Sequence, residues 1–167
     1  GVGKLAFVRR FVREMTASAT PPLVLFGRCY EREAVPFKAW SGVVGELAQH
    51  LRERPDGEVE ALLPEGTGLL TRVFDELARV PAVAKRNDLP SAEPTETRRR
   101  TFAAFRALLG AVARERPVVI VVDDLQWADA DSLELVQELM APPGSPPILL
   151  VATMRLATET GPRPIQT

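Results

Sequence analysis

The chain reads Val-Val-Ile-Val-Val-Asp-Asp-Leu-Gln-Trp-Ala-Asp-Ala-Asp at residues 118–131, and this stretch decides the fold. Its first five residues are β-branched and none is polar, which predicts a strand buried on both faces in a parallel sheet covered by helices. Asp123 and Asp124 end this strand. Because ligands bind beyond the carboxyl ends of strands in open α/β sheets, both carboxylates are candidates for chemistry. Asp also ends strands and begins turns, so a purely structural role stays open.

The size and composition are those of one ordinary globular domain. The chain has 167 residues, of which 46% are hydrophobic and 26% charged, with a formal net charge of -1. This balance excludes a disordered chain and gives no sign of wholesale binding to nucleic acid or membranes. No apolar run approaches the roughly 20 residues that a membrane-spanning helix needs. Cys29 is the only cysteine, so no internal disulfide forms, and we expect a reducing, cytoplasmic location.

Apolar periodicity before this stretch predicts alternating helices and strands. Residues 4–18 and 36–51 carry apolar side chains at helical spacing. Between them, residues 23–26 (Leu-Val-Leu-Phe) form a short apolar run, which predicts a second buried strand. This succession of helix, break and strand indicates an α/β fold.

Further helices are expected over residues 68–80 and 95–114, with a polar loop at 82–95 between them. The arginines of the second of these helices are interpreted as a solvent-exposed face. Asp131, with Glu134 three residues later, is interpreted as the N-cap of the helix that follows the central stretch.

The start and the end of the chain carry candidates for phosphate binding. Gly1-Val2-Gly3-Lys4 opens the first predicted helix; glycines let a backbone approach phosphate oxygens, helix-terminal N–H groups point toward them, and a lysine supplies a positive charge. A flexible glycine-rich end of the chain is the alternative. A third apolar run at residues 148–153 predicts another buried strand, and Arg155 follows it. The glycine and lysine start, the strand that ends in two aspartates and the strand followed by Arg155 occur in the order that indicates a phosphate site.

These motifs resemble those of P-loop ATPases. Gly1-Val2-Gly3-Lys4 is similar to the end of a Walker A loop, residues 118–124 to a Walker B strand, and Gln126-Trp127-Ala128-Asp129 to the segment that follows it in signal-transduction ATPases. Over nearly its whole length the chain resembles the STAND branch of AAA-like P-loop proteins, as found in LuxR-type transcription regulators, multidomain Ser/Thr protein kinases and class III adenylate cyclases. The resemblance implies an α/β, three-layer P-loop NTPase fold of the AAA (ASCE) type with a parallel sheet.

The resemblance also implies how the domain is organised. Residues 1–167 would form a partial AAA-like ATPase domain, with a Walker A remnant at 1–4, the Walker B strand at 118–124 and a sensor strand at 148–155. We expect the chain to be a fragment that lacks the first strand and the C-terminal part of this domain. Covalently attached effector domains (kinase, cyclase or DNA-binding) and a nucleotide-dependent oligomer are implied as partners, with no direct nucleic-acid contact and no membrane.

Each matching residue receives a role from the resemblance, with ATP and Mg²⁺ as ligands. Lys4 would contact the β- and γ-phosphates. Asp123 would hold Mg²⁺, and Asp124 would orient or deprotonate the attacking water. Arg155 would stand at the sensor position near the γ-phosphate, whereas Thr153 is a weaker polar candidate that is explained equally well as a strand residue. The loop that approaches the phosphates would consist of Gly1, Val2, Gly3 and Lys4.

One position departs from the Walker pattern and keeps several functions open. Leu5 follows the lysine where the pattern has Ser or Thr, and it has no oxygen to offer a metal. The first function is an ATP-binding regulatory module within a larger signalling protein, with ATP hydrolysis left open. The alternative is a degenerate P-loop scaffold for protein interaction, with weak or no hydrolysis. A third, an acid–base enzyme that uses the aspartates without nucleotide, requires the glycine and lysine start to be a coincidence.

Four other residues have ordinary structural interpretations. Trp40 and Trp127 are expected to pack in or against the core. His50 is expected on the surface, and Cys29 is expected to be an inert, half-buried thiol.

Overall fold

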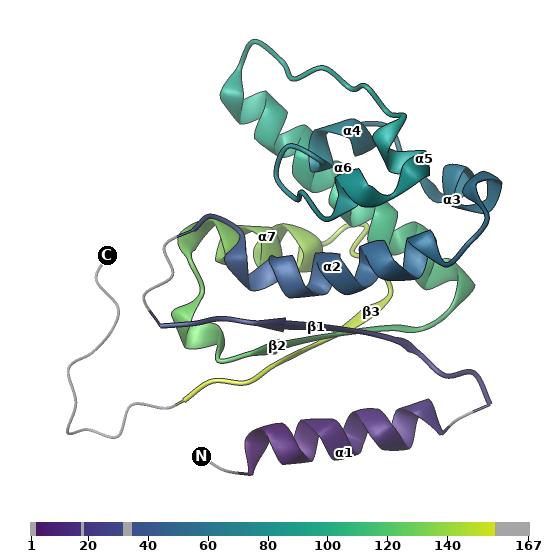
Figure 1. Ribbon diagram of the computed structural model, residues 1–167. Helices are drawn as coiled ribbons and strands as arrows, with labels where there is room; N and C mark the ends of the chain where they lie inside the picture. The colour runs from purple at the N-terminus through teal and green to yellow at the C-terminus, as the bar shows by residue number, and fades with distance from the viewer. Residues whose placement is uncertain (1–2, 18, 32–34, 156–167) are drawn as a thin grey trace.

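The computed structural model describes residues 3–17, 19–31 and 35–155. Three parallel strands form one sheet in the order β1-β2-β3, where β1 is Leu23–Arg28, β2 is Val118–Asp123 and β3 is Ile148–Ala152. Helices cover both faces of this sheet, which gives three layers (Figure 1). The predicted α/β fold with a parallel sheet is confirmed.

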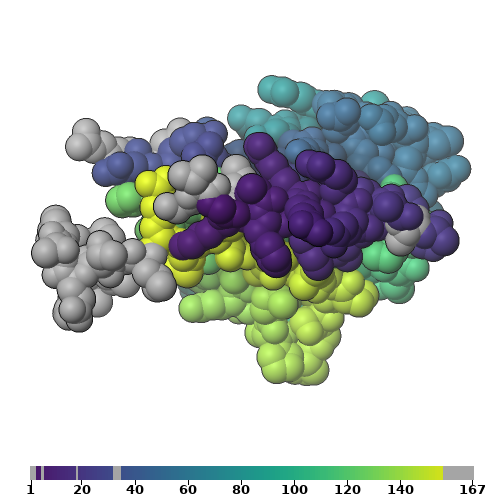
Figure 2. All heavy atoms as spheres, turned by 90° about the horizontal axis from the view of Figure 1, so that it is seen from below, coloured from purple at the N-terminus to yellow at the C-terminus, as the bar shows by residue number. Residues whose placement is uncertain are grey.

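The two faces of the sheet are covered unequally. Helix α1 (Lys4–Thr16) lies alone across one face, as Figures 1 and 2 show. Helices α2 (Lys38–Arg52), α7 (Ala130–Met140) and α6 (Pro94–Glu115) lie on the side of the other face. Helix α6 begins far from the sheet and runs down toward it, where it contacts β3. The short helices are α3 (Asp56–Leu62), α4 (Thr67–Leu70), η1 (Leu77–Arg79), α5 (Pro81–Ala84) and η2 (Leu125–Trp127).

The central strand β2 is buried along its whole length because both of its sides are apolar. Val119 and Val121 pack against Val8 of α1. Ile120 and its neighbours on the same side of the strand pack into the larger core formed with α2, α6 and α7. The unbroken β-branched run therefore serves two cores at once, as the sequence predicts.

Two glycines bring α2 into close contact with β1. A Cβ atom at Gly27 would lie 2.4 Å from the carbonyl oxygen of Ala39, and one at Gly42 would lie 2.6 Å from that of Phe26. Neither position has room for a side chain, so the backbones of α2 and β1 touch directly. This contact fixes the start of α2 beside the carboxyl end of β1.

The helical predictions are wrong in the middle of the chain. Residues 68–80 do not form one helix, because α4 ends at Leu70 and η1 spans only Leu77–Arg79. The short helices α3 and α5 were not predicted, and α5 lies partly in the expected loop at 82–95. Leu70 and Phe74 are at most 2% exposed, so packing against α6 holds this region in separate turns despite its helical spacing.

The N-cap of α7 is Asp129 and not Asp131. The Asp129 carboxylate accepts hydrogen bonds from the Ser132 N–H (2.8 Å) and the Ser132 hydroxyl (2.6 Å), which is the usual bonding of a capping residue. Asp131 lies in the first turn, where its carboxylate accepts a hydrogen bond from Arg98 (2.6 Å). Asp129 and Asp131 are two residues apart in the sequence, and only the hydrogen bonds with Ser132 show which of them caps the helix.

The interpretation of the α6 arginines as a simple exposed face is wrong for Arg98. Its guanidinium pairs with Glu134 (2.5 Å) as well as Asp131, and it lies over the rings of Phe37 and Phe102, 5.6 and 4.9 Å from their centroids. This arginine therefore ties α6 to α7. No helix in the described ranges is long and apolar enough to cross a membrane.

Candidate functional site

The carboxyl ends of β2 and β3 bring three polar residues together. Because Val122 pairs with Ala152 in the parallel register, the residues that follow them, Asp123 and Thr153, are neighbours. The Thr153 hydroxyl donates a hydrogen bond to Asp123 Oδ1 (2.5 Å) and accepts one from the Asp124 N–H (3.0 Å). All three residues are at most 9% exposed. Thr153, only a weaker candidate from the sequence, thus connects both acidic residues.

Asp124 turns the chain sharply at the end of β2. Its backbone has φ 56° and ψ 43°, in the left-handed region that Asp tolerates better than most residues. The turn is held by the Leu125 N–H, which donates to the Thr153 carbonyl oxygen (2.9 Å). Consecutive residues of a regular strand point to opposite faces, so this turn is what lets Asp123 and Asp124 share neighbours.

Arg155 contacts the Asp124 carboxylate from the β3 side. Its Nε lies 3.1 Å from Oδ1, and its Nη2 lies 3.4 Å from Oδ2. The Gln126 side chain joins both residues, since its amide nitrogen donates to Asp124 Oδ1 (3.1 Å) and its oxygen accepts from the Arg155 N–H (3.0 Å). The hydrogen bond from Gln126, together with the Arg155 and Arg28 charges, lowers the pKa of Asp124, so this carboxylate is ionised at neutral pH.

Arg28, the last residue of β1, contacts the same carboxylates from the other side. Its Nε lies 3.7 Å from Asp123 Oδ2 and its Nη2 lies 3.6 Å from Asp124 Oδ2. Sequence reasoning did not select this arginine. The parallel register pairs Arg28 with Asp123. The available signal was the position of Arg28 two residues after the strand predicted at 23–26.

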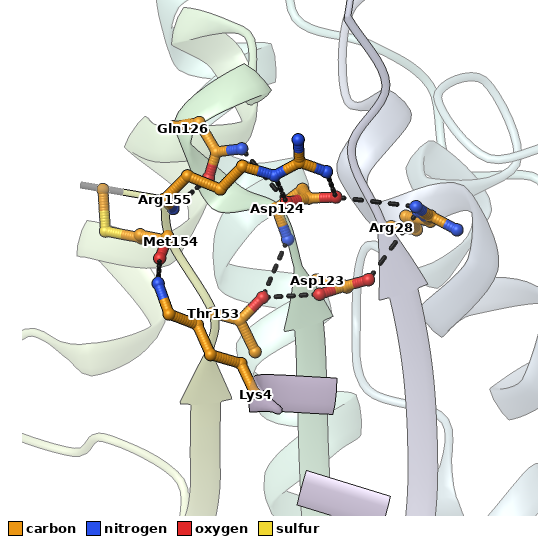
Figure 3. A network of polar contacts seen from close by, with 8 residues as sticks. All are labelled: Lys4, Arg28, Asp123, Asp124, Gln126, Thr153, Met154 and Arg155. Carbon is orange, nitrogen blue, oxygen red and sulfur yellow. Dashed lines mark hydrogen bonds and ion pairs between the residues drawn. The ribbon is translucent and has the colours of Figure 1, made fainter. Parts of the chain in front are cut away.

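Lys4 lies at the start of α1, on the β3 side of the acidic pair, opposite Arg28 (Figure 3). Its ammonium group donates a hydrogen bond to the Met154 carbonyl oxygen and no bond to either carboxylate is found. Gly3 is the N-cap of α1, and a Cβ atom there would meet nothing within 4 Å. Gly1 and Val2 lie outside the described residues, as does the side chain of Leu5.

The arrangement combines two carboxylates with three basic side chains. Within the described ranges no group of three or more His, Cys, Asp or Glu residues could hold a metal ion by itself. Mg²⁺, however, commonly binds through one or two carboxylates together with substrate phosphates and water. The donor set of Asp123 and Asp124 fits a magnesium ion that arrives with a phosphate ligand, and Lys4, Arg28 and Arg155 can neutralise that ligand.

The structural predictions are confirmed for Trp40 and Trp127, are partly wrong for Cys29 and are wrong for His50. Trp40 is buried and donates from Nε1 to the Ser132 carbonyl oxygen (3.1 Å), and Trp127 packs against the core, as expected. Cys29 is more deeply buried than expected, at 3% exposure; burial and the nearby aspartates raise its pKa to about 11, so it stays an inert thiol. His50 does not lie freely on the surface, because its Nε2 is buried without a hydrogen-bond partner.

A hydrogen bond from Phe37 connects the segment after β1 to the segment after β2. The Phe37 N–H donates to Asp129 Oδ1 (3.2 Å), and Phe37 has a left-handed backbone with φ 60°. A bulky residue rarely adopts this conformation unless its surroundings impose it. The ring of Phe37 packs edge-on against Phe74 and Phe102, which holds the strained residue in place.

Comparison with known proteins gave one result. The sequence profile of the AAA ATPase domain family matches residues 1–151 of the chain. No curated protein and no solved structure gave a significant match. The matched range contains Lys4, Arg28 and the acidic pair, and it ends within β3, before Thr153 and Arg155.

Proposed function

The chain belongs to the AAA ATPase domain family, and on this premise we propose that it is an ATP-binding regulatory module of the STAND type. Its nucleotide state would set the conformation of attached kinase, cyclase or DNA-binding domains and the assembly of nucleotide-dependent oligomers. The observation that carries the proposal is the bonded network at the ends of β2 and β3, with Lys4 beside it (Figure 3).

The phosphates of ATP would lie between the start of α1 and the acidic pair. Lys4, with the loop formed by Gly1, Val2 and Gly3, would contact the β- and γ-phosphates. The ammonium group of Lys4 donates a hydrogen bond to the Met154 carbonyl oxygen, which is a neutral acceptor. A phosphate oxygen is a stronger acceptor for a cation, so this bond is readily exchanged.

Asp123 would hold Mg²⁺, with the Thr153 hydroxyl fixing its other oxygen. The bond from Thr153 occupies Oδ1, which leaves Oδ2, the oxygen that faces Arg28 at 3.7 Å, for the metal. Mg²⁺ would supply charge neutralisation to the phosphates. Arg28 would then leave Asp123, because two cations compete for one oxygen.

Asp124 and Arg155 would act on the γ-phosphate end. Asp124 is kept ionised by Gln126, Arg155 and Arg28, as a group that orients or deprotonates water must be. The Arg155 side chain is 70% exposed, so it is free to turn from Asp124 toward a bound γ-phosphate. This exchange of partners would report the nucleotide state.

The alternative function is a degenerate scaffold for protein interaction. It is favoured by Leu5, which brings no oxygen to the metal, and by the fact that Arg28 and Arg155 already neutralise the acidic pair. In that case ATP would bind weakly or not at all, with weak or no hydrolysis.

Titration with a fluorescent ATP analogue tests the proposal. We expect micromolar affinity for the wild-type protein in Mg²⁺ and a loss of about tenfold or more in Lys4→Ala, because one charge-assisted hydrogen bond contributes about 1.5–3 kcal/mol. Arg13→Ala on the same helix is the matched control and should bind as the wild type. Equal affinity of Lys4→Ala and Arg13→Ala would overturn the proposed site.

Phosphate release separates the switch from the scaffold. We expect turnover that falls in Asp124→Asn and rises in Leu5→Ser, which restores a metal-ligating hydroxyl. A protein that binds the analogue but releases no phosphate, with no gain in Leu5→Ser, would be the scaffold.

A further inference from the structure

A second cavity lies at the edge of the sheet formed by β1, on the far side of Asp123 from Lys4. Its volume is about 380 Å³, and its walls come from α1, the carboxyl end of β1 and the first turns of α2. Another cavity lies beside Lys4, between α1 and the end of β3, and among the described residues none lines both cavities. The side chains that matter for its chemistry are Arg9, Arg28, Tyr30, Lys38, Ser41 and Asp123.

Basic side chains outnumber acidic ones in this cavity. Arg9, Arg28 and Lys38 line it, and Asp123 is the only acidic residue among the described residues that do so. One oxygen of Asp123, Oδ1, accepts the hydrogen bond from the Thr153 hydroxyl. Positive charges gathered around a concave surface concentrate the field there and attract anions. The cavity is therefore suited to an anion.

The rest of the cavity is partly apolar. Gly27 and Gly42 form part of its wall, and their tight backbone contacts leave no side chain to fill it. Phe26 supplies apolar surface, and the ring of Tyr30 lies 5.4 Å from the Arg28 guanidinium and is about half exposed. A space of this volume, with a charged side and an apolar side, is typical of sites for small organic ligands.

We propose that this cavity binds a small organic phosphate, with the phosphate group between Arg9 and Arg28 and the organic part against Tyr30. The Ser41 hydroxyl adds a neutral hydrogen-bond donor on the same wall. Arginine is the side chain best shaped for planar, two-point recognition of phosphate oxygens. The binding itself is independent of ATP binding at Lys4.

Arg28 belongs to both sites and couples them. It reaches Asp123 and Asp124 at 3.6–3.7 Å, and a phosphate in the cavity competes with these carboxylates for its guanidinium. Binding of the organic phosphate therefore frees the acidic pair for Mg²⁺, and by reciprocity Mg²⁺ tightens binding of the organic phosphate. This coupling, unlike the binding, rests on the proposed function.

Calorimetric titration with a sugar phosphate, and with inorganic phosphate for comparison, tests the binding. We expect the sugar phosphate to bind the wild type in the absence of Mg²⁺ and nucleotide, and more tightly than inorganic phosphate. Arg9→Glu should weaken it at least tenfold. Ser41→Asp should do the same while keeping a residue suited to a helix start. Arg13→Glu, with the same charge change elsewhere on α1, and Lys4→Ala should each stay within twofold of the wild type.

Three results would overturn the inference. The first is no binding by the wild type. The second is an equal loss in Arg9→Glu and Arg13→Glu, which would reduce the effect to the overall charge of α1. The third is a loss in Lys4→Ala as large as in Arg9→Glu, which would put the ligand in the nucleotide site. Failure of ATP binding with the expected sugar phosphate result would leave the cavity assignment intact.

Discussion

Replacing Thr153 by Val should destabilise the domain strongly, although the two side chains have nearly the same shape. The change removes the hydroxyl that donates to Asp123 and accepts from the Asp124 N–H, both in buried surroundings. A hydrogen bond to a charged group contributes about 1.5–3 kcal/mol, and a buried N–H left unpaired costs about 1–3 kcal/mol. Asp123 keeps some access to water, with its side chain 13% exposed, so we expect a total of about 2–4 kcal/mol.

Urea denaturation measures this loss. With a slope of about 2 kcal/mol per molar urea, the midpoint should fall by about 1–2 M while the slope stays constant. Thr101→Val is the matched control, because Thr101 is also buried but its hydroxyl bonds only the Thr97 carbonyl of its own helix (2.8 Å). That substitution should cost less than about 1 kcal/mol. Equal midpoints for the two variants would refute the idea that the Thr153 hydroxyl holds the acidic pair.

Three further predictions concern Gly42 in the wall of the cavity beside β1, His50, and Arg155. Gly42→Ala should lower the melting temperature, because the added Cβ would lie 2.6 Å from a backbone oxygen and overpacking of this kind costs about 1–3 kcal/mol of unfolding free energy. Gly57→Ala, whose Cβ would meet nothing within 4 Å, should leave the melting temperature unchanged. Burial and the charges of two arginines lower the pKa of His50, so the unfolded chain binds a proton at a higher pH than the folded protein does. The free energy of unfolding should therefore fall as the pH drops through about 6.5. This pH dependence should weaken in His50→Gln. Arg155→Gln should lower the affinity for ATP about tenfold without changing that for ADP, which lacks the γ-phosphate.

Each of these has a result that counts against it. A melting temperature of Gly42→Ala equal to that of Gly57→Ala would mean that the contact of α2 with β1 is loose. An unchanged pH dependence in His50→Gln would assign it to other groups. Equal losses of ATP and ADP affinity in Arg155→Gln would mean that Arg155 does not sense the γ-phosphate.

The sheet could be predicted from the sequence because its strands follow a simple rule of burial. A run of β-branched residues with no polar member, as in residues 118–122, is typical of a strand that is covered by apolar layers on both faces of a parallel sheet. Asp123 and Asp124 were found for the same reason, since the end of such a strand is defined by its first charged residues. The helices over residues 4–18 and 95–114 were likewise recognised, with their ends displaced by a few residues.

What could not be predicted depends on contacts between distant segments. In the region of residues 67–84, α4 packs against α6, η1 against α2, and α5 against α3, and local spacing does not reveal these contacts. Arg28 joins the site because β1 and β2 end at the same level, and Thr153 because its hydroxyl meets two residues of another strand. The cap of α7 at Asp129 is decided by its bond to Ser132, a choice between two aspartates that no pattern makes.

The hydrogen bond of Phe37 described above has a partner that joins the same two segments. The Cys29 N–H donates to the Asp123 carbonyl oxygen (3.0 Å), and the Phe37 N–H donates to the Asp129 side chain (3.2 Å). The segment that leaves β1 and the segment that leaves β2 are therefore fastened to each other at both ends. We expect the bonded residues at these ends to move together, so that a ligand that displaces the acidic pair also displaces the starts of α2 and α7. Such a coupling would transmit a displacement of the acidic pair to the helices α2 and α7.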